Sequence, residues 1–320
     1  MIESSVHRAA LPQLEGDLFL TDGGIETALI FEHGIDLPHF AAFHLLDDSE
    51  YRKLISSYFQ PYIDIARRFR SGFVIGSVTW RASQDWGRRL GYSKESLAEA
   101  NRAAIELCCA IRGASDAFEV PMVVSGCLGP RGDGYMPGSV MTADESQLYH
   151  EVQMGTFVET AADMVTAASM NYVEEAIGIA RAAKAMGMPL VESFTLGTDG
   201  ALPNGATLEQ AILQVDDATD GYVSYFGVNC AHATHFEHLL VDAKPWTKRI
   251  RAVRANASKQ SHQELDSSTE LDAGDPVEFG RDYGRLKATA RQLNILGGCC
   301  GTDHRHIEQI AMSCLGDPTQ

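Results

Sequence analysis

The sequence predicts a single (β/α)₈ barrel of the TIM-barrel class, and two observations lead to this expectation. Eight short apolar runs alternate with segments of helical spacing along the 320 residues. This alternation is typical of parallel βαβ units, and eight is the number of strands that closes such a barrel. A doubly wound sheet is the alternative, but no Gly-x-Gly-x-x-Gly follows a strand candidate and no composition break marks a second lobe. We therefore expect one domain over residues 1–320.

Each expected strand is a continuous apolar run that stops at glycine or polar residues. The first run ends at Asp22-Gly23-Gly24, and the seventh is the weakest. In chain order, the expected strands cover residues 18–22, 73–79, 121–126, 163–167, 188–194, 222–228, 249–254 and 293–296.

The segments between these runs carry apolar residues at the three-to-four spacing of an amphipathic helix. In the first of them, Leu54, Tyr58 and Ile65 follow this spacing. In chain order, the expected helices cover residues 49–70, 97–112, 145–160, 173–186 and 208–218.

Residues 255–280 interrupt the alternation. Serine, glutamine and acidic residues dominate this segment, and its apolar residues show little periodicity. Because it is too polar for the core and too long for an ordinary connection, we interpret it as an inserted loop between the seventh and eighth strands. It is either a cover over the site or a merely solvated insertion.

Residues that follow the strands of such a barrel meet at one rim, where the active site lies. Several polar residues, one glycine and three cysteines fall at these positions. They are Asp22, Thr79, Gly126, Ser193, Asn229, Cys230, Asn256, Cys299 and Cys300.

The net charge and the apolar composition exclude some classes of binding partner. The formal net charge is −17, which argues against nucleic acid and anionic membrane surfaces and favours small ligands, cationic ones included. No stretch reaches the roughly 18 apolar residues of a membrane helix, and Met1–Ser5 lacks the features of a signal peptide. We expect a soluble, cytoplasmic protein; the sequence leaves open whether it forms a homo-oligomer.

The seven cysteines, an odd number in a chain expected in a reducing compartment, favour metal binding or catalysis over a disulfide framework. Cys299 and Cys300 are adjacent, a poor arrangement for bridging each other, but two thiolates between glycines can reach one metal ion. Cys230 follows the sixth strand at the same rim. Three thiolates suit a zinc ion with one open position; the alternative is packed, reduced thiols. Cys127 is the other cysteine expected at this rim.

A second interpretation places a metal site at His232, His235, Glu237 and His238, because several of these residues share one helical face. Zinc deaminases combine a His-x-Glu element with a Cys-x-x-Cys element. The second element is absent here, so we interpret the histidines as a solvated helix face.

Asn229-Cys230 together with the late Gly297-Gly298-Cys299-Cys300-Gly301-Thr302 resembles the homocysteine S-methyltransferase family of zinc-dependent thiol methyltransferases. The resemblance covers nearly the whole chain. Further segments similar to family motifs are Asp22-Gly23-Gly24, Thr79-Trp80-Arg81-Ala82-Ser83, Gly129-Pro130 and Ser193-Phe194-Thr195.

The resemblance implies a (β/α)₈ barrel in which Cys230, Cys299 and Cys300 bind Zn²⁺ at the C-terminal rim of the strands, and the open position accepts the thiol of homocysteine. A free thiol has a pKa near 8.5, and coordination to zinc deprotonates it. The thiolate then attacks the methyl group of a small onium donor that is S-methylmethionine-, betaine- or S-adenosylmethionine-like, and the product is methionine. No catalytic side chain is implied beyond the zinc-activated thiol.

We expect the substrate contacts among the residues near the strand ends. The candidates are Asp22, Thr79, Trp80, Glu192, Ser193 and Asn229. An onium group binds well to aromatic faces, and the candidate rings are Trp80, Trp86, Tyr135, Phe194 and Tyr225. Arg81 is a candidate for a donor carboxylate, with a surface ion pair as the alternative.

The sequence departs from the family at one position. Many members carry a glutamate at the end of the fourth strand that binds the amino group of homocysteine, and that position falls on Ala168. Either Asp22 or Glu192 replaces it, or the acceptor is a different thiol. A non-catalytic zinc-binding barrel is the third hypothesis.

Overall fold

The computed structural model describes residues 4–115, 120–241 and 244–318. Eight parallel strands pair in chain order, and β1 pairs with β8 to close the barrel. The predicted (β/α)₈ barrel is thereby confirmed, including its weak seventh strand. The strands are β1 Phe19–Leu20, β2 Gly72–Gly76, β3 Met122–Leu128, β4 Met164–Met170, β5 Leu190–Phe194, β6 Tyr225–Asn229, β7 Ile250–Ala255 and β8 Ile295–Gly298.

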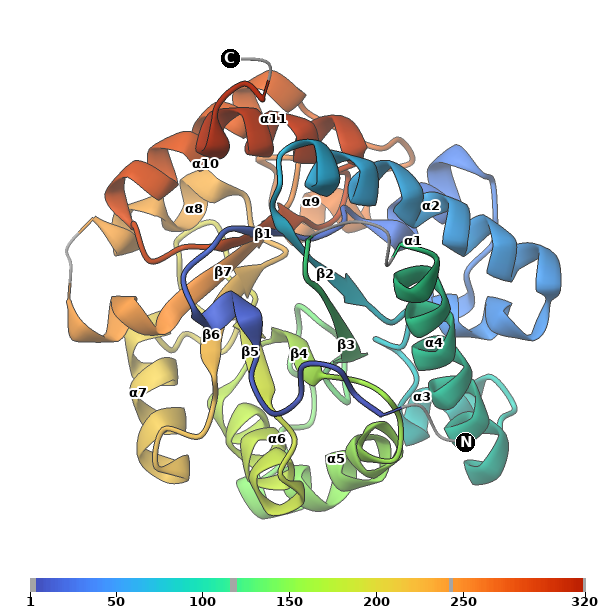
Figure 1. Ribbon diagram of the computed structural model, residues 1–320. Coiled ribbons are helices and arrows are strands. Elements are labelled where there is room, and N and C mark those ends of the chain that lie inside the picture. The colour runs from blue at the N-terminus through green and yellow to red at the C-terminus, as the bar shows by residue number, and fades with distance from the viewer. Residues whose placement is uncertain (1–3, 116–119, 242–243, 319–320) are drawn as a thin grey trace.

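Helices surround the strands (Figure 1). The α-helices are α1 Ile25–Thr27, α2 Ser49–Arg68, α3 Gln84–Arg89, α4 Lys94–Ala114, α5 Ala143–Val158, α6 Val173–Met186, α7 Leu208–Thr219, α8 Ala233–Phe236, α9 His262–Asp266, α10 Pro276–Thr289 and α11 His304–Leu315. The five predicted helices are present, with α6 at its predicted bounds. Local signals explain several ends: Thr142 and Thr207 open α5 and α7 with capping boxes, and Gly187 ends α6 in the left-handed region at φ 65°.

The prediction that residues 255–280 form one inserted loop is partly wrong. The short helix α9 lies inside it, and α10 begins at Pro276 with Asp275 as its N-cap. Asp275 accepts hydrogen bonds from the first turn, and proline is favoured at the first helical position. The irregular part of this segment is therefore shorter than predicted.

Alternation along each strand separates two apolar layers. One apolar residue from each strand belongs to the inner layer, and Leu11 from the segment before β1 joins it. The inner residues of the strands are Phe19, Val74, Val123, Met164, Val191, Tyr225, Ala252 and Ile295. Figure 1 shows the segment before β1 crossing this end of the barrel. The barrel interior is therefore filled at its N-terminal end.

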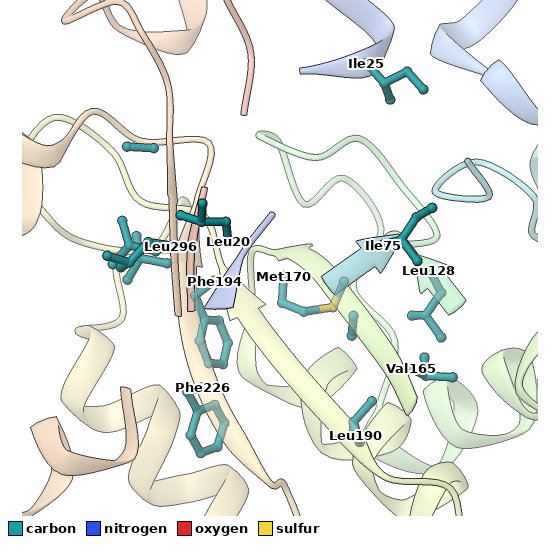
Figure 2. Close-up of a cluster of buried hydrophobic side chains, with 14 of the residues drawn as sticks. Leu20, Ile25, Ile75, Leu128, Val165, Met170, Leu190, Phe194, Phe226 and Leu296 are labelled. Carbon is teal, nitrogen blue, oxygen red and sulfur yellow. The ribbon is translucent and has the colours of Figure 1, made fainter. Parts of the chain in front are cut away.

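The next residue along most strands points outward against the helices. Figure 2 shows this outer layer, with Leu20, Ile75, Val165, Phe194, Phe226 and Leu296 among its members. These side chains are buried, and burial of large apolar side chains of this kind stabilises a fold by about 1.5–3 kcal/mol each. The outer layer fixes the strand orientations and hence the positions of the residues at the opposite, C-terminal rim. In the part of the chain that the structure describes, no helix is long and apolar enough to cross a membrane.

Candidate metal and substrate site

Three cysteine sulfurs meet at the C-terminal rim. Cys230 directly follows β6, and Cys299 and Cys300 directly follow β8. Their Sγ atoms all lie within 4.8 Å of one another, and the Cys230 and Cys299 Sγ atoms are 2.6 Å apart. Within the described ranges, this is the only group of three or more His, Cys, Asp or Glu side chains with metal-binding spacing. Three converging thiols are a donor set that fits Zn²⁺, which binds thiolates at about 2.3 Å.

Neighbouring polar groups hydrogen-bond to the Cys230 sulfur. Asn229 donates from Nδ2 to Cys230 Sγ at 3.3 Å and to Ser169 Oγ at 2.8 Å. The Ser169 N–H donates to Asn229 Oδ1 at 3.0 Å, and Ser169 itself has a left-handed φ of 63°. The strained residue lies where the pairing of β4 with β5 shifts register. This local distortion brings Ser169 from β4 against Cys230, which follows β6.

The three thiols influence one another's ionisation. Hydrogen bonds from Cys299 and Cys300 hold the pKa of the Cys230 thiol well below its usual value. The same contact with Cys230 raises the pKa of Cys300 well above its usual value. One thiolate therefore suppresses ionisation of its neighbours, whereas a divalent cation between the sulfurs favours all three thiolates.

The turn between β1 and α1 packs directly on the turn that carries Cys299. The Gly24 N–H donates to Thr302 O at 3.0 Å, and the Gly298 N–H donates to Asp22 O at 3.0 Å. A Cβ at Gly24 would lie 2.5 Å from Cys299 O, a separation that real Cβ atoms essentially never show. The glycine is required here because the two backbones touch.

Asp22 braces these two turns. Its Oδ1 lies 2.8 Å from Arg254 Nη2, and Tyr58 OH donates to its Oδ2 at 3.3 Å. Arg254 also donates to Gly298 O at 2.9 Å and to Gly23 O at 3.0 Å. Burial raises the pKa of Asp22, and the adjacent guanidinium opposes that rise. The carboxylate of Asp22 thus helps to hold the rim together while it also lines the cavity.

A cavity of about 440 Å³ opens above the inner layer and includes the three cysteines in its wall. The segment after β7 lines its mouth with His262, Leu265, Ser268 and Leu271. Acidic side chains outnumber basic ones in the wall. The acids are Asp22, Glu26, Asp133, Asp266, Glu270 and Asp272, and the arginines are Arg81 and Arg254. The wall is therefore suited to a ligand that carries positive charge.

The structure brings most of the predicted site residues to this cavity. Those in its wall are Asp22, Trp80, Ser193, Asn229, Cys230, Cys299 and Cys300. Thr79 and Glu192 do not line it. Thr79 is fully buried behind the rim and donates from Oγ1 to Cys127 O at 2.6 Å. Cys127 is in the cavity wall but outside the three-sulfur group.

Glu192 lies on the outer face of β5, so the expectation that it binds substrate is wrong. Its neighbours Val191 and Ser193 line the cavity, and alternation along the strand turns Glu192 the other way. It is fully buried, neither carboxylate oxygen has a hydrogen-bond partner, and burial together with nearby Asp216 of α7 raises its pKa well above the usual value. It therefore cannot replace the acid missing at Ala168.

Glu192→Met should raise the midpoint of thermal unfolding at pH 8 by about 2–8 °C, since a buried polar group without partners costs roughly 1–3 kcal/mol. The folded state raises the pKa of Glu192, so the wild type loses stability as the pH rises above the unfolded value near 4.3. The gain should thus shrink toward pH 4. Calorimetry at pH 4.5 and pH 8 measures both. An equal gain at both pH values would show that ionisation of Glu192 is not the cause.

The candidate aromatic residues separate into two groups. Trp80, Tyr135 and Tyr225 line the cavity, whereas Trp86 and Phe194 do not. Tyr135 stacks on His262 with ring centroids 3.8 Å apart, and its hydroxyl lies 3.9 Å from Cys300 Sγ. The stack joins the loop after β3 to α9 beside the three-sulfur group. The sequence did not indicate His262, because a histidine in a polar segment carries no signal of where it folds.

The expected solvated face of histidines is wrong for His232. This side chain is buried, caps α8 by accepting from the Thr234 N–H, and lies with Nε2 3.7 Å from Asp282 Oδ2. Burial lowers its pKa to about 4. None of the four residues considered as an alternative metal site, His232, His235, Glu237 and His238, belongs to the three-sulfur group.

Comparisons with known proteins agree with this geometry. A family model described as homocysteine S-methyltransferase matches residues 19–314. The homocysteine S-methyltransferase YbgG of Bacillus subtilis (strain 168) is 24% identical over 241 residues, which cover 69% of this chain and 74% of that protein. Betaine–homocysteine S-methyltransferase 1 of Rattus norvegicus is 26% identical over 261 residues, or 74% of this chain and 60% of the rat protein.

Solved structures share the fold. The metallated form of the homocysteine methyltransferase MmuM from Escherichia coli aligns with a TM-score of 0.69 at 19% identity, covering 92% of this chain and 96% of that one. The oxidised form of MmuM aligns with a TM-score of 0.70 at 20% identity, covering 94% and 97%.

Proposed function

Because the chain belongs to the homocysteine S-methyltransferase family and is a methyltransferase, we propose that it moves a methyl group from a small onium donor to the thiol of homocysteine, which gives methionine. The three converging sulfurs of Cys230, Cys299 and Cys300 in the cavity wall carry this proposal. They are the ligands that we assign to Zn²⁺.

Bound zinc would keep the acceptor thiol ionised at neutral pH and so provide the nucleophile. The residues of the chain position this chemistry. Hydrogen bonds from Asn229 and Ser169 to the Cys230 sulfur fix its orientation, a role that outer partners of metal ligands commonly have. The positive charge of Arg254 opposes the rise in the pKa of Cys299.

The residues of the cavity wall indicate the chemical class of the methyl donor. Its carboxylates favour a cation, and Trp80 and Tyr135 offer aromatic faces to an onium group. A volume of about 440 Å³ lies within the range of small-molecule sites. The donor is therefore a small sulfonium or ammonium compound, of the S-methylmethionine, betaine or S-adenosylmethionine type.

In this proposal the chain forms a single domain. The segment after β7 is part of that domain and covers the cavity. Its residues at the mouth of the cavity and the stack of His262 on Tyr135 support that role. A cover excludes water from the reacting thiolate and holds donor and acceptor in line.

One observation favours a second candidate function. Ala168 lines the cavity at the position where the family resemblance implies a glutamate for the amino group of homocysteine. A different thiol acceptor, with the same zinc-dependent transfer, is therefore the second candidate.

A methyl-transfer assay tests both. The zinc-loaded protein is incubated with homocysteine and with S-methylmethionine, betaine or S-adenosylmethionine in turn, and methionine is measured by mass spectrometry. Methionine formed with any of the donors supports the proposal. Methylation confined to other thiols, such as cysteine or 2-mercaptoethanol, supports the second candidate. Bound zinc without turnover of any thiol contradicts both and leaves a non-catalytic zinc-binding barrel.

A further inference from the structure

Arg81 is a buried cation in the cavity wall without an acidic partner. Its guanidinium lies between two indole rings, 4.0 Å from the centroid of Trp80 and 4.0 Å from that of Trp86. Nη1 donates to Gly132 O at 2.7 Å, and the buried Nε has no acceptor. Within the described ranges, no carboxylate lies within 4.0 Å of this side chain, which is only 6% exposed.

A buried charge is costly unless a partner compensates it. Burial lowers the pKa of Arg81 only to about 10, so the guanidinium stays charged at neutral pH. Both indoles contact the centre of the guanidinium, its Nε still lacks an acceptor, and a carboxylate is the group whose geometry matches a guanidinium edge. Arg81 therefore has the properties of a preorganised carboxylate anchor in a cavity that is otherwise acidic.

Glu26 is the matching acid. It lies in α1, two residues after the Gly24 that touches the Cys299 backbone, and it lines the cavity. The structure gives it no ion pair within 4.0 Å among the residues it describes. Burial raises its pKa to about 7, and the charges of Cys299 and Asp22 add to that rise. A bound cation would keep Glu26 ionised.

Three other acids of the wall already have partners. Asp22 pairs with Arg254. Asp133 accepts from the N–H groups of Tyr135 and Met136. Asp272 accepts from Ser258 and from the Gly274 N–H. Asp266 and Glu270 are exposed, which leaves Glu26, half-buried in the cavity wall, as the acid available to a ligand there.

We propose that Glu26 and Arg81 together bind the α-amino-acid end of the thiol acceptor, with the ammonium group at Glu26 and the carboxylate at Arg81. The two side chains influence each other's charge across the cavity, but they lie too far apart for an ion pair. Their opposite charges in one cavity wall match the opposite charges of a zwitterion. Both side chains and the three cysteines line the same cavity, so a thiol held by its amino-acid end can extend to the three sulfurs.

This inference rests on the proposed function and restricts its acceptor to a thiol that carries an amino-acid end. It also moves the ammonium contact from the fourth strand, where Ala168 lacks an acid, to α1. Glu26 and Arg81 are positioning and specificity residues; the chemistry of methyl transfer does not require them.

The test is a set of binding measurements by calorimetry on the zinc-loaded protein, with three thiols that differ in one group. L-homocysteine carries both charges, 4-mercaptobutyrate lacks the ammonium, and 3-mercaptopropylamine lacks the carboxylate. Glu26→Gln should weaken homocysteine and 3-mercaptopropylamine by about 10- to 100-fold, the worth of a charge-assisted hydrogen bond, and leave 4-mercaptobutyrate unchanged. Arg81→Met should weaken homocysteine and 4-mercaptobutyrate to a similar extent and spare the amine.

The matched controls are Glu99→Gln and Arg291→Met, which change exposed residues outside the cavity and should leave all three affinities unchanged. Circular dichroism verifies folding, and Arg81→Lys serves as a milder variant if Arg81→Met does not fold. Ala168→Glu should give no tighter binding of homocysteine, because the ammonium is already held.

Equal weakening of all three thiols by Glu26→Gln, no weakening by either variant, or tighter binding of homocysteine to Ala168→Glu would overturn the inference. Methyl transfer to homocysteine would persist in these cases, so the proposed function would stand. Failure of every thiol to bind the wild type would instead contradict the proposed function and the inference together.

Discussion

Cys299→Ser is expected to lose bound zinc and to reduce methyl transfer by more than about 100-fold, because even changes to the outer partners of metal ligands cost about 10- to 100-fold. The residue supplies one of three sulfurs that lie within 4.8 Å of one another, and two thiolates with a hydroxyl form a much poorer zinc site. Zinc content by mass spectrometry of the purified protein and the rate of methionine formation measure the two effects.

Cys314→Ser is the matched control for this change. Cys314 lies on α11, outside the cavity and outside the three-sulfur group, so its replacement should preserve zinc content and rate. Full activity of Cys299→Ser with zinc bound would show that this sulfur is not a ligand. Loss of activity with zinc retained would point instead to a role for Cys299 in positioning the acceptor.

Gly24→Ala should lower zinc affinity by about 10- to 100-fold, although the residue bears no side chain and contacts no metal. The added methyl would lie 2.5 Å from Cys299 O and 2.6 Å from Thr27 Oγ1, so the turn that carries Cys299 must move. Displacing a ligand by a fraction of an ångström weakens a metal site strongly because its geometry is fixed. Competition with a chromogenic zinc chelator measures the affinity.

The control is Gly113→Ala in α4, where an added Cβ meets nothing within 4 Å. This change should leave zinc affinity unchanged and slightly raise stability, since alanine is favoured over glycine inside a helix by roughly 1 kcal/mol. Wild-type affinity in Gly24→Ala would mean that the β1–α1 turn moves without carrying Cys299 along, and the packing of the two turns would then have no part in shaping the site.

The fold and the three cysteines could be predicted because they depend on local, periodic information. Apolar runs alternate with helical segments along the chain, and parallel strands bring the residues after β6 and β8 to one rim. That rule alone brings Cys230 to the same rim as Cys299. The same rule predicted the wrong role for Glu192. It identifies residues near the end of a strand, but it does not say whether they point into the barrel or toward the helices. The period-two alternation that puts Ser193 in the cavity turns Glu192 toward α7.

Glu26 could not be recognised from the sequence for a different reason. It lies two residues beyond Asp22-Gly23-Gly24, and whether such a residue faces the cavity depends on the turn of α1, which packing against Cys299 and Thr302 decides. Arg81 was named as a carboxylate contact, but its burial between two indoles requires Trp86 to reach back from α3. Long-range packing of this kind leaves no periodic trace in the chain.

The pairing of β1 with β8 sets the time at which the metal site can form. It joins Phe19 to Ile295, and contacts between residues so distant along the chain form late during folding, because a large loop must close first. Cys299 and Cys300 reach Cys230 only when β8 has taken its place between β7 and β1. We therefore expect capture of the metal to accompany completion of the barrel, and the rate at which the thiols become protected from alkylation measures that step.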